Sequence, residues 1–213
     1  MFTGIIKTMG SVKKILPQGG DFRITFRADN IAWQDFEVGE SISVNGVCLT
    51  AIRLHEDGFD ADVSGETMRV SAFMGLAENM SVNLEPSLAI GERIGGHFVS
   101  GHIDCIGQIV SRQKDARSIA FEVDLPKKYA RYIAAKGSVC IDGVSLTVNG
   151  IHKTVFTVNV IPHTADTTII GNYALGDKVN IEVDLIARYL ERLIDPPNNG
   201  VITKELLKVN GYE

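Results

Sequence analysis

The sequence repeats itself, and this internal duplication limits the possible folds more than any other feature. The block Gly46-Val47-Cys48-Leu49-Thr50 returns 97 positions later as Gly143-Val144-Ser145-Leu146-Thr147, and other short blocks return at the same offset without a net gap. Fourteen identical pairs at one fixed offset indicate two domains of about 95 residues that descend from one unit. We therefore predict a division of the chain into residues 1–96, residues 97–184 and a C-terminal segment of residues 185–213.

Within each repeat, the hydrophobic pattern has a period of two residues. Residues 41–45, 156–160 and 179–184 alternate polar and apolar side chains, which is typical of half-buried strands. Turn signals separate these strands, among them Asn45-Gly46 and Asp142-Gly143. Several short strands in each repeat predict an all-β fold, either a small antiparallel barrel or a sandwich. We favour closed barrels, because closure leaves no edge strand exposed.

The pattern changes after Asp184. Apolar residues three and four positions apart, Ile186, Leu190 and Leu193, predict an amphipathic helix that ends at the prolines and glycine of residues 196–200. A second short helix is predicted within residues 203–209. The apolar face of the first helix could cover a barrel of its own chain or pack against other copies of the chain, and the pattern does not distinguish these arrangements.

Composition excludes several classes of protein. The chain has 213 residues, of which 45% are hydrophobic and 22% charged, and its net charge of −5 provides no basic surface for nucleic acid. Its three cysteines are odd in number and lack CxxC spacing, which argues against a disulfide framework and for a reducing compartment. Because no signal peptide and no apolar run of membrane-spanning length are apparent, we predict a cytoplasmic protein that binds neither membrane nor nucleic acid.

Positions at which the repeats differ are candidates for chemistry, since like pockets with unlike reactive groups would suit a reaction between two similar molecules. Four pairs are relevant: Ile5 and His102, Cys48 and Ser145, Glu66 and His163, and Gly39 and Lys136. Taken alone, each residue also has a plainer interpretation. Cys48 could be a small core residue, His163 a hydrogen-bonded loop residue and Lys136 a solvated turn residue.

The sequence contains no cofactor motif. His97 and His102 are five residues apart, which fits neither common spacing of zinc ligands. Gly95, Gly96 and Gly101 do not form the GxGxxG pattern of dinucleotide-binding folds. We therefore predict neither a metal nor a cofactor.

Five segments together resemble a known family, the riboflavin synthases of the alpha-chain type. They are MFTGI at residues 1–5, NGVCLT at 45–50, GGHFVSGHID at 95–104, DGVSLT at 142–147 and IPHT at 161–164. The resemblance runs in order to about residue 195. It implies two six-stranded Greek-key barrels, an N-terminal lumazine-binding barrel (1–96) and a C-terminal one (97–184), followed by a helix and tail (185–213) that contribute to a trimer.

The resemblance also implies an activity. Members of the family transfer a four-carbon unit between two molecules of 6,7-dimethyl-8-ribityllumazine, which gives riboflavin and 5-amino-6-(ribitylamino)uracil. No metal or redox cofactor is needed, because one molecule gains what the other loses. The resemblance further implies a homotrimer whose active sites form between the N-terminal barrel of one subunit and the C-terminal barrel of another. Lumazine synthase is a possible further partner.

Residue roles follow from the same resemblance. His102 is expected to transfer the proton of the lumazine C7 methyl group, because the pKa of a free imidazole is about 6.5. Cys48 or Ser145 is expected to act as nucleophile, and His97 and Thr147 complete the expected catalytic set. The remaining expected substrate contacts are Phe2, Gly4, Ile5, Ile6, Ser41, Leu49, Thr50, Asp62, Val63, Ser64, Gly65, Glu66, Thr67, Gly101, Ile103, Lys136 (across the subunit boundary), Asp142, Leu146, Ile161, Pro162, His163, Thr164, Ala165 and Asp166.

Two positions depart from the family pattern. Cys105 and Gly65 stand where the family more often has a glycine and a bulkier residue, respectively, and neither change removes an expected reactive group. The main alternative function is that of a non-catalytic lumazine- or flavin-binding protein, such as the optical antenna proteins that share this duplicated fold. Such a protein is expected to lack reactive residues in at least one half, whereas both halves of this chain contain them. A structural two-barrel interaction module is a third interpretation.

Overall fold

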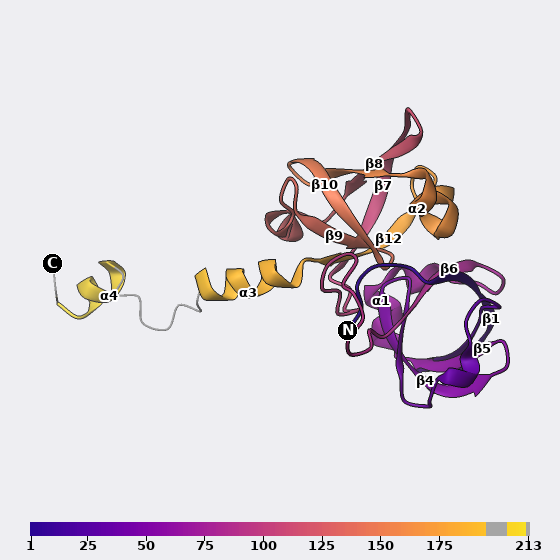
Figure 1. Ribbon diagram of the computed structural model, residues 1–213. Helices are drawn as coiled ribbons and strands as arrows, with labels where there is room; N and C mark the ends of the chain where they lie inside the picture. Colours follow the sequence, from indigo (N-terminus) through magenta and orange to yellow (C-terminus); the bar gives the residue numbers. More distant parts are fainter. Residues whose placement is uncertain (195–203, 212–213) are drawn as a thin grey trace.

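The computed structural model describes residues 1–194 and 204–211, which form two closed antiparallel β-barrels followed by a helix (Figure 1). The N-terminal barrel has the strand order β1-β2-β5-β4-β3-β6 and consists of β1 (Thr8–Gln18), β2 (Asp21–Arg27), β3 (Ser41–Val44), β4 (Val47–His55), β5 (Gly58–Val63) and β6 (Ser81–Pro86). The C-terminal barrel closes in the equivalent order and consists of β7 (Cys105–Asp115), β8 (Ser118–Asp124), β9 (Ser138–Ile141), β10 (Val144–His152), β11 (Val155–Val160) and β12 (Lys178–Val183). The predicted all-β fold with two homologous barrels is confirmed.

Short helical segments connect some of the strands. They are α1 (Gly65–Val70), α2 (Pro162–Thr167) and the 3-10 segments η1 (Trp33–Asp35), η2 (Ala72–Gly75), η3 (Lys127–Tyr132) and η4 (Ile169–Asn172). The segments of the two halves correspond, since α1 and η2 follow β5 as α2 and η4 follow β11.

Two-residue turns set the register of the equivalent hairpins β3–β4 and β9–β10. Asn45 and Gly46 have φ angles of 45° and 78°, and Asp142 and Gly143 have φ angles of 42° and 83°. Positive φ at both central positions is required by the type I′ turn, whose twist matches that of paired strands. The predicted turns therefore determine which side chains of β4 and β10 face outward.

Each barrel is filled by its own apolar side chains. In the N-terminal barrel, the ring of Phe59 lies 5.3 Å from that of Phe26 and 5.5 Å from that of Trp33, measured between centroids. In the C-terminal barrel, Phe121 and Tyr173 meet edge to face. Because successive residues of a strand point to opposite faces, the polar residues between these core positions lie on the outer faces of the barrels.

Hydrogen bonds between the barrels obey the same 97-residue offset as the sequence. Asn83 donates to the backbone oxygen of Asp142 over 2.8 Å, and Asn180 donates to that of Asn45 over 2.9 Å. The side-chain oxygen of each asparagine accepts a backbone N–H from the opposite half of the chain. Both asparagines are fully buried. The two barrels are therefore joined by an approximately two-fold symmetric interface.

Helix α3 (Leu185–Ile194) follows β12 and extends away from both barrels, and α4 (Lys204–Val209) is the last element of the chain (Figure 1). Both predicted C-terminal helices are confirmed, whereas the predicted stop at residues 196–200 lies outside the described residues. Arg188 contacts Asp104, and Glu191 contacts Tyr132 and Arg131, so that one side of α3 is attached to the C-terminal half.

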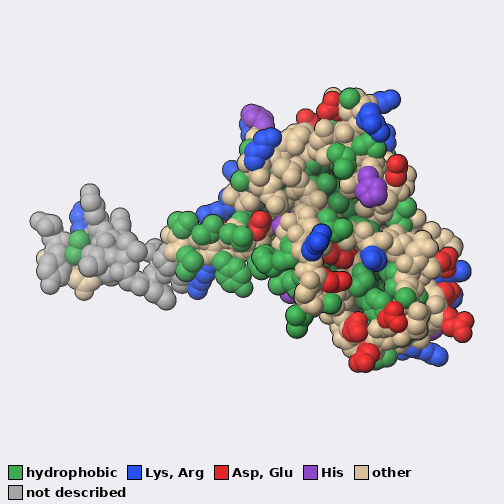
Figure 2. Space-filling view, in the orientation of Figure 1, with side chains coloured by type: hydrophobic (Ala, Val, Ile, Leu, Met, Phe, Trp, Pro, Cys, Tyr) green, Lys and Arg blue, Asp and Glu red, His purple; other side chains and the backbone are tan. Residues whose placement is uncertain are grey.

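The opposite side of α3 is apolar and exposed (Figure 2). The exposed fractions of its side chains range from 50% for Leu190 to 78% for Ile194, and Ile186, Tyr189 and Leu193 lie between these values. Within the described part of one chain, at least half of each of these side chains therefore stays exposed. No helix of the described residues is long and apolar enough to cross a membrane.

Candidate functional site

A row of polar side chains on the outer face of the N-terminal barrel forms the first part of the candidate site. Cys48 and Thr50 of β4 point outward, because their neighbours along the strand are buried in the core. In the adjacent strand β3, Ser43 pairs with Cys48 and Ser41 pairs with Thr50. A thiol and two hydroxyl groups of the predicted set, those of Cys48, Thr50 and Ser41, therefore lie side by side on one surface.

The end of β5 and the start of α1 extend this row. Asp62 accepts two hydrogen bonds from the guanidinium group of Arg23, of 2.8 and 2.9 Å, and this contact lowers the pKa of Asp62. Ser64 caps α1 by accepting the N–H of Thr67 over 3.0 Å. A Cβ atom on Gly65 would lie 2.6 Å from a backbone oxygen of the β1–β2 turn, which accounts for the glycine at this position.

The C-terminal barrel carries an equivalent row. Ser145 and Thr147 of β10 pair with Cys140 and Ser138 of β9. The helix that follows, α2, begins with Pro162 and has no side-chain cap. The predicted residues Ile161, Thr164, Ala165 and the exposed His163 and Asp166 surround this helix start.

Two extended segments, residues 2–6 and 97–103, cross between the barrels and complete the two rows. We call them the crossing segments. Phe2 and Val99 pair in antiparallel orientation, with backbone hydrogen bonds of 2.8 and 3.1 Å. Two residues further along each segment, the backbone oxygen of Gly4 accepts the N–H of Ser145, and that of Gly101 accepts the N–H of Cys48, both over 2.8 Å.

Only glycine fits at these two contacts. Gly4 and Gly101 have φ angles of 75° and 82°, a region that other residues rarely adopt. A Cβ atom on Gly4 would lie 2.6 Å from that of Ser145, and one on Gly101 would lie 2.5 Å from that of Cys48. The repeated glycine is therefore needed for the close approach of each crossing segment to its nucleophilic side chain.

His97 contacts the side chain of Ser145. Its Nδ1 atom lies 2.6 Å from Ser145 Oγ, and its buried Nε2 atom has no hydrogen-bond partner in the described part of the chain. Burial lowers the pKa of His97, against the opposing effect of the Asp184 charge, so that the imidazole is neutral near neutral pH. A neutral imidazole in contact with a hydroxyl group is an arrangement that can activate the hydroxyl or move its proton. Among the described residues, no group of His, Cys, Asp and Glu side chains could hold a metal ion.

His102 lies in a different environment. Its side chain is exposed and, with Ile103 on the same crossing segment, lines a cavity of about 410 Å³. The other wall of this cavity is formed by α3, including Arg188 and Tyr189. The imidazole of His102 is thus accessible to a substrate from this cavity, and α3 contributes to its surroundings.

The three cysteines differ in access. Cys105 and Cys140 are buried, and burial raises the pKa of Cys105 to about 12 and that of Cys140 well above its usual range. Cys48 is partly exposed. Because the thiolate is the reactive form of cysteine, Cys48 is the thiol positioned to react in the folded protein.

Known proteins share the sequence pattern of both halves. Residues 3–87 and 100–184 each match the family described as Lumazine binding domain. The chain is 39% identical to riboflavin synthase of Photobacterium phosphoreum over 216 residues, which cover 100% of this chain and 99% of the relative. It is 35% identical to riboflavin synthase of Bacillus subtilis over 216 residues, which cover 100% of both chains. The chain belongs to the riboflavin synthase family of enzymes.

Solved structures show the same fold. LumP complexed with 6,7-dimethyl-8-(1'-D-ribityl) lumazine superposes with a TM-score of 0.77 at 24% sequence identity, covering 86% of this chain and 99% of that chain. LumP complexed with riboflavin superposes with a TM-score of 0.79 at the same identity and coverage. The tandem barrels of this riboflavin synthase family member are therefore also found in LumP.

Several predicted side chains do not join either row. The carboxyl group of Asp142 is buried and accepts hydrogen bonds from the Tyr173 hydroxyl (2.5 Å) and the Asn180 N–H (2.8 Å). Burial raises the pKa of Asp142 to about 7, although these hydrogen bonds oppose the shift. The side chains of Leu49 and Val63 lie in the N-terminal core, so only their backbone groups face the outer surface. Lys136 lies in an exposed turn.

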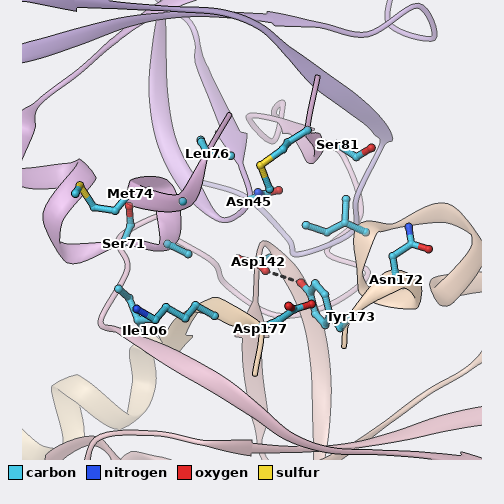
Figure 3. Close-up of a pocket in the computed structure, with 15 residues that line it drawn as sticks. Asn45, Ser71, Met74, Leu76, Ser81, Ile106, Asp142, Asn172, Tyr173 and Asp177 are labelled. Atoms are coloured by element: carbon cyan, nitrogen blue, oxygen red, sulfur yellow. Dashed lines mark hydrogen bonds between the residues drawn. The ribbon is translucent and has the colours of Figure 1, made fainter. Parts of the chain in front are cut away.

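A larger cavity, of about 590 Å³, lies between the two halves of the chain (Figure 3). Its wall is formed by η2 and the residues beside it on one side and by η4 on the other, with Met74, Leu76, Ile106 and Tyr173 among its residues. Of the predicted substrate contacts, only Asp142 lies in this wall. The larger cavity of this riboflavin synthase family member is therefore not lined by the reactive groups of the two rows.

The structure also adds residues that the sequence interpretation missed. Asn159 occupies the position of Asp62 in the second repeat, and its buried side-chain oxygen has no hydrogen-bond partner among the described residues. Ser138 corresponds to Ser41 and pairs with Thr147. Applying the 97-residue offset to every predicted N-terminal contact would have identified both residues.

Proposed function

We propose that this chain is a riboflavin synthase that converts two molecules of 6,7-dimethyl-8-ribityllumazine into riboflavin and 5-amino-6-(ribitylamino)uracil. The observation that carries the proposal is the pair of equivalent outer-face rows with different reactive groups, a thiol at Cys48 in one and the Ser145–His97 pair in the other. Two similar rows suit two identical substrate molecules. Unlike reactive groups suit the different fates of those molecules, since one loses the four-carbon unit that the other gains.

The reactive residues have distinct tasks in this proposal. His102, which a substrate can reach from its cavity, accepts a proton from the C7 methyl group of one lumazine. The thiol of Cys48 or the hydroxyl of Ser145 adds to the ring of the other lumazine and leaves again when the new ring closes. His97 takes the proton of the Ser145 hydroxyl and returns it, because its imidazole is neutral and in contact with that group. Thr147 and Thr50 donate hydrogen bonds to the two heterocycles.

The ribityl chain is a polyol and needs hydrogen-bonding partners. In the N-terminal half, these partners are the polar groups around the start of α1, namely Asp62, Ser64, Glu66 and Thr67. In the C-terminal half, they are His163, Thr164 and Asp166 around the start of α2, together with Asn159. Phe2, Gly4, Ile5 and Ile6 line one ring pocket, and Gly101, His102 and Ile103 line the other.

We further propose that the protein acts as a cytoplasmic homotrimer with active sites between subunits. The exposed apolar side of α3 supports this proposal, because contact with other copies would remove it from water. Lys136 is exposed in its turn, and we expect it to reach across the subunit boundary. Truncation before Leu185 is expected to yield monomers with little activity. An active monomer would exclude both the trimer and the shared site, and association with lumazine synthase stays a prediction.

The decisive experiment is anaerobic incubation of the purified protein with 6,7-dimethyl-8-ribityllumazine and no added cofactor. We expect one riboflavin for every two lumazines consumed, with an equal amount of the aminouracil. Tight binding without turnover would contradict the synthase and support a non-catalytic, antenna-type function, in which the same fold only holds the chromophore. Absence of both binding and turnover would contradict both functions.

A further inference from the structure

The position of the crossing segment at Cys48 depends on one buried glutamate. Glu182 of β12 is 3% exposed. It accepts hydrogen bonds from the backbone N–H of Ser100 (2.6 Å), the hydroxyl of Ser100 (2.7 Å) and the N–H of Gly101 (2.9 Å). Gly101 in turn accepts the N–H of Cys48, and His102 follows it directly. Glu182 belongs to the C-terminal barrel, yet it holds the segment that contacts the N-terminal row.

Glu85, the equivalent glutamate of the N-terminal barrel, contacts the other crossing segment. Glu85 of β6 is 5% exposed and accepts from the backbone N–H of Thr3 (2.7 Å), its hydroxyl (2.8 Å) and the N–H of Gly4 (3.0 Å). The backbone oxygen of Gly4 accepts the N–H of Ser145, and that of Thr3 accepts the N–H of His97 over 3.1 Å. A residue of the N-terminal barrel thus holds the segment that contacts the C-terminal row.

Both positions require a carboxylate. Each glutamate accepts hydrogen bonds from the three donors named above, and the N–H of Ile5 also favours the charged form of Glu85. A carboxylate suits such a site because it is a side chain with acceptors only. A glutamine of the same shape would turn an NH₂ group toward at least one of these donors. Hydrogen bonds to a charged group are stronger than those between neutral groups, so this change disturbs the segment more than a lost neutral contact would.

We propose that Glu85 and Glu182 are positioning residues of the two substrate sites, each acting on the site of the opposite barrel. Glu182 sets the position of Gly101 and His102 at Cys48, and Glu85 sets the position of Thr3 and Gly4 at the Ser145–His97 pair. This inference rests on the proposed function for its catalytic consequence, whereas the cross-barrel positioning can be measured in the protein without substrate.

The test compares Glu182→Gln with Glu85→Gln in the full-length protein, so that each variant is the matched control of the other. Glu182→Gln is expected to change the rate of Cys48 alkylation by iodoacetamide roughly tenfold and to shift the side-chain NMR signals of His102, while leaving His97 unchanged. Glu85→Gln is expected to shift the signals of His97 and to leave Cys48 alkylation at the wild-type rate. Both variants are expected to lower turnover by about ten- to hundredfold.

A purely structural role predicts a different result. If either variant loses thermal stability while Cys48 alkylation and both histidine signals stay as in the wild type, or if both variants affect both sites alike, the proposal is wrong. Should a glutamine variant fail to fold, Ser100→Ala and Thr3→Ala remove one donor from each glutamate and must show the same reciprocal pattern. Ser100→Thr and Thr3→Ser keep the hydroxyl groups and should restore wild-type behaviour.

Failure of the proposed function has its own signature. If the wild-type protein neither binds nor converts the lumazine, the synthase proposal fails, and the reciprocal response of Cys48 and His97 still decides the positioning role. If the wild type is active but the response is not reciprocal, only the positioning role is excluded.

Discussion

The two barrels share one backbone arrangement and differ in the groups that it presents. In each, a type I′ hairpin and a crossing glycine bring one nucleophilic side chain to the same position, Cys48 in the N-terminal half and Ser145 in the C-terminal half. Among the described residues, Ser145 has a histidine, His97, in contact with its side chain, and no such contact is found at Cys48. The comparison shows that duplication can keep a scaffold unchanged while the side chains that it presents diverge.

The two halves also contribute different side chains to the interface between the barrels. Asn45 and Asp142 occupy equivalent turns, and each accepts a backbone N–H through its side chain. In the C-terminal half, the carboxyl group of Asp142 also meets the hydroxyl of Tyr173, whose counterpart in the N-terminal half is Leu76. One half therefore contains a buried titratable pair where the other half contains an amide and an apolar side chain.

The largest effect is expected from removing the histidine that distinguishes the C-terminal row. His97→Gln should lower turnover by about 100-fold or more, which is the usual contribution of a group that transfers protons. Because burial lowers the pKa of His97, its protonation should contribute a loss of wild-type activity on the acidic side of the ordinary imidazole pKa of about 6.5, and the variant should lack this contribution. Steady-state rates between pH 5 and 8 check both points.

His102→Gln is the matched comparison for that experiment. It should also lower turnover, because His102 is proposed to accept the methyl proton, but the acidic decline assigned to His97 should remain. Wild-type turnover in His102→Gln would exclude it from proton transfer. An unchanged pH profile in His97→Gln would exclude the Ser145–His97 pair from the reaction.

Making the two rows alike should have the next largest effect. Cys48→Ser gives both halves a hydroxyl group, and turnover is expected to fall by about tenfold to 100-fold, since a hydroxyl group is the weaker nucleophile at neutral pH. Ser145→Cys makes the exchange in the opposite half and serves as the control for side-chain size. Single-turnover rates at saturating lumazine separate the loss of chemistry from a loss of binding. Unchanged turnover in Cys48→Ser would exclude an obligatory thiol.

The interface difference should appear as a pH dependence of stability. The pKa of Asp142 is raised to about 7 in the folded protein, so the folded state binds its proton more tightly than the unfolded chain does. This contribution to stability is complete below about pH 4 and is lost as the pH rises through 7, by up to about 4 kcal/mol in total. Asp142→Asn removes this contribution. As the pH rises from 4 to 8, the free energy of unfolding of the variant should therefore increase by up to this amount relative to that of the wild type.

Denaturant unfolding at several pH values measures that difference, in which the other titrating groups cancel. Asn45→Asp provides the converse experiment, because it places a carboxyl group in the equivalent turn of the N-terminal half. Asn45→Asp should make the free energy of unfolding fall as the pH rises, as Asp142 does in the wild type. A stability difference between wild type and Asp142→Asn that does not vary with pH would show that Asp142 does not bind a proton in this range.

The smallest effect is expected from the ion pair that only the N-terminal row contains. Arg23 and Asp62 are both partly exposed, and their counterparts in the second repeat are Ala120 and Asn159. Arg23→Ala should weaken lumazine binding about two- to fivefold and leave the unfolding temperature within about 2 °C of wild type. Arg27→Ala, which removes another exposed arginine of β2, is the control. If the two changes weaken binding equally, the contact of Arg23 with Asp62 does not contribute to ligand affinity.

The sequence predicted those parts of the molecule that depend on neighbouring residues or on the repeat itself. The alternation around Ser41 and the Asn45-Gly46 and Asp142-Gly143 pairs predicted the hairpins, because strand period and turn conformation are properties of short segments. The spacing of Ile186, Leu190 and Leu193 predicted the amphipathic helix for the same reason. Asp142 was placed among substrate contacts by resemblance, and nothing local in the sequence indicates that its carboxyl group is buried against Tyr173.

Only the tertiary structure decided how the two halves serve each other. The hydrogen bonds between Glu85 and Thr3 and between Glu182 and Ser100 join residues 82 positions apart, and the contact of His97 with Ser145 spans 48 positions. Such contacts arise from the closure of each barrel and the packing of one barrel on the other, which no periodicity of a short segment encodes. The sequence determined two copies of one barrel, and the packing of those copies determined that each holds part of the other's candidate site.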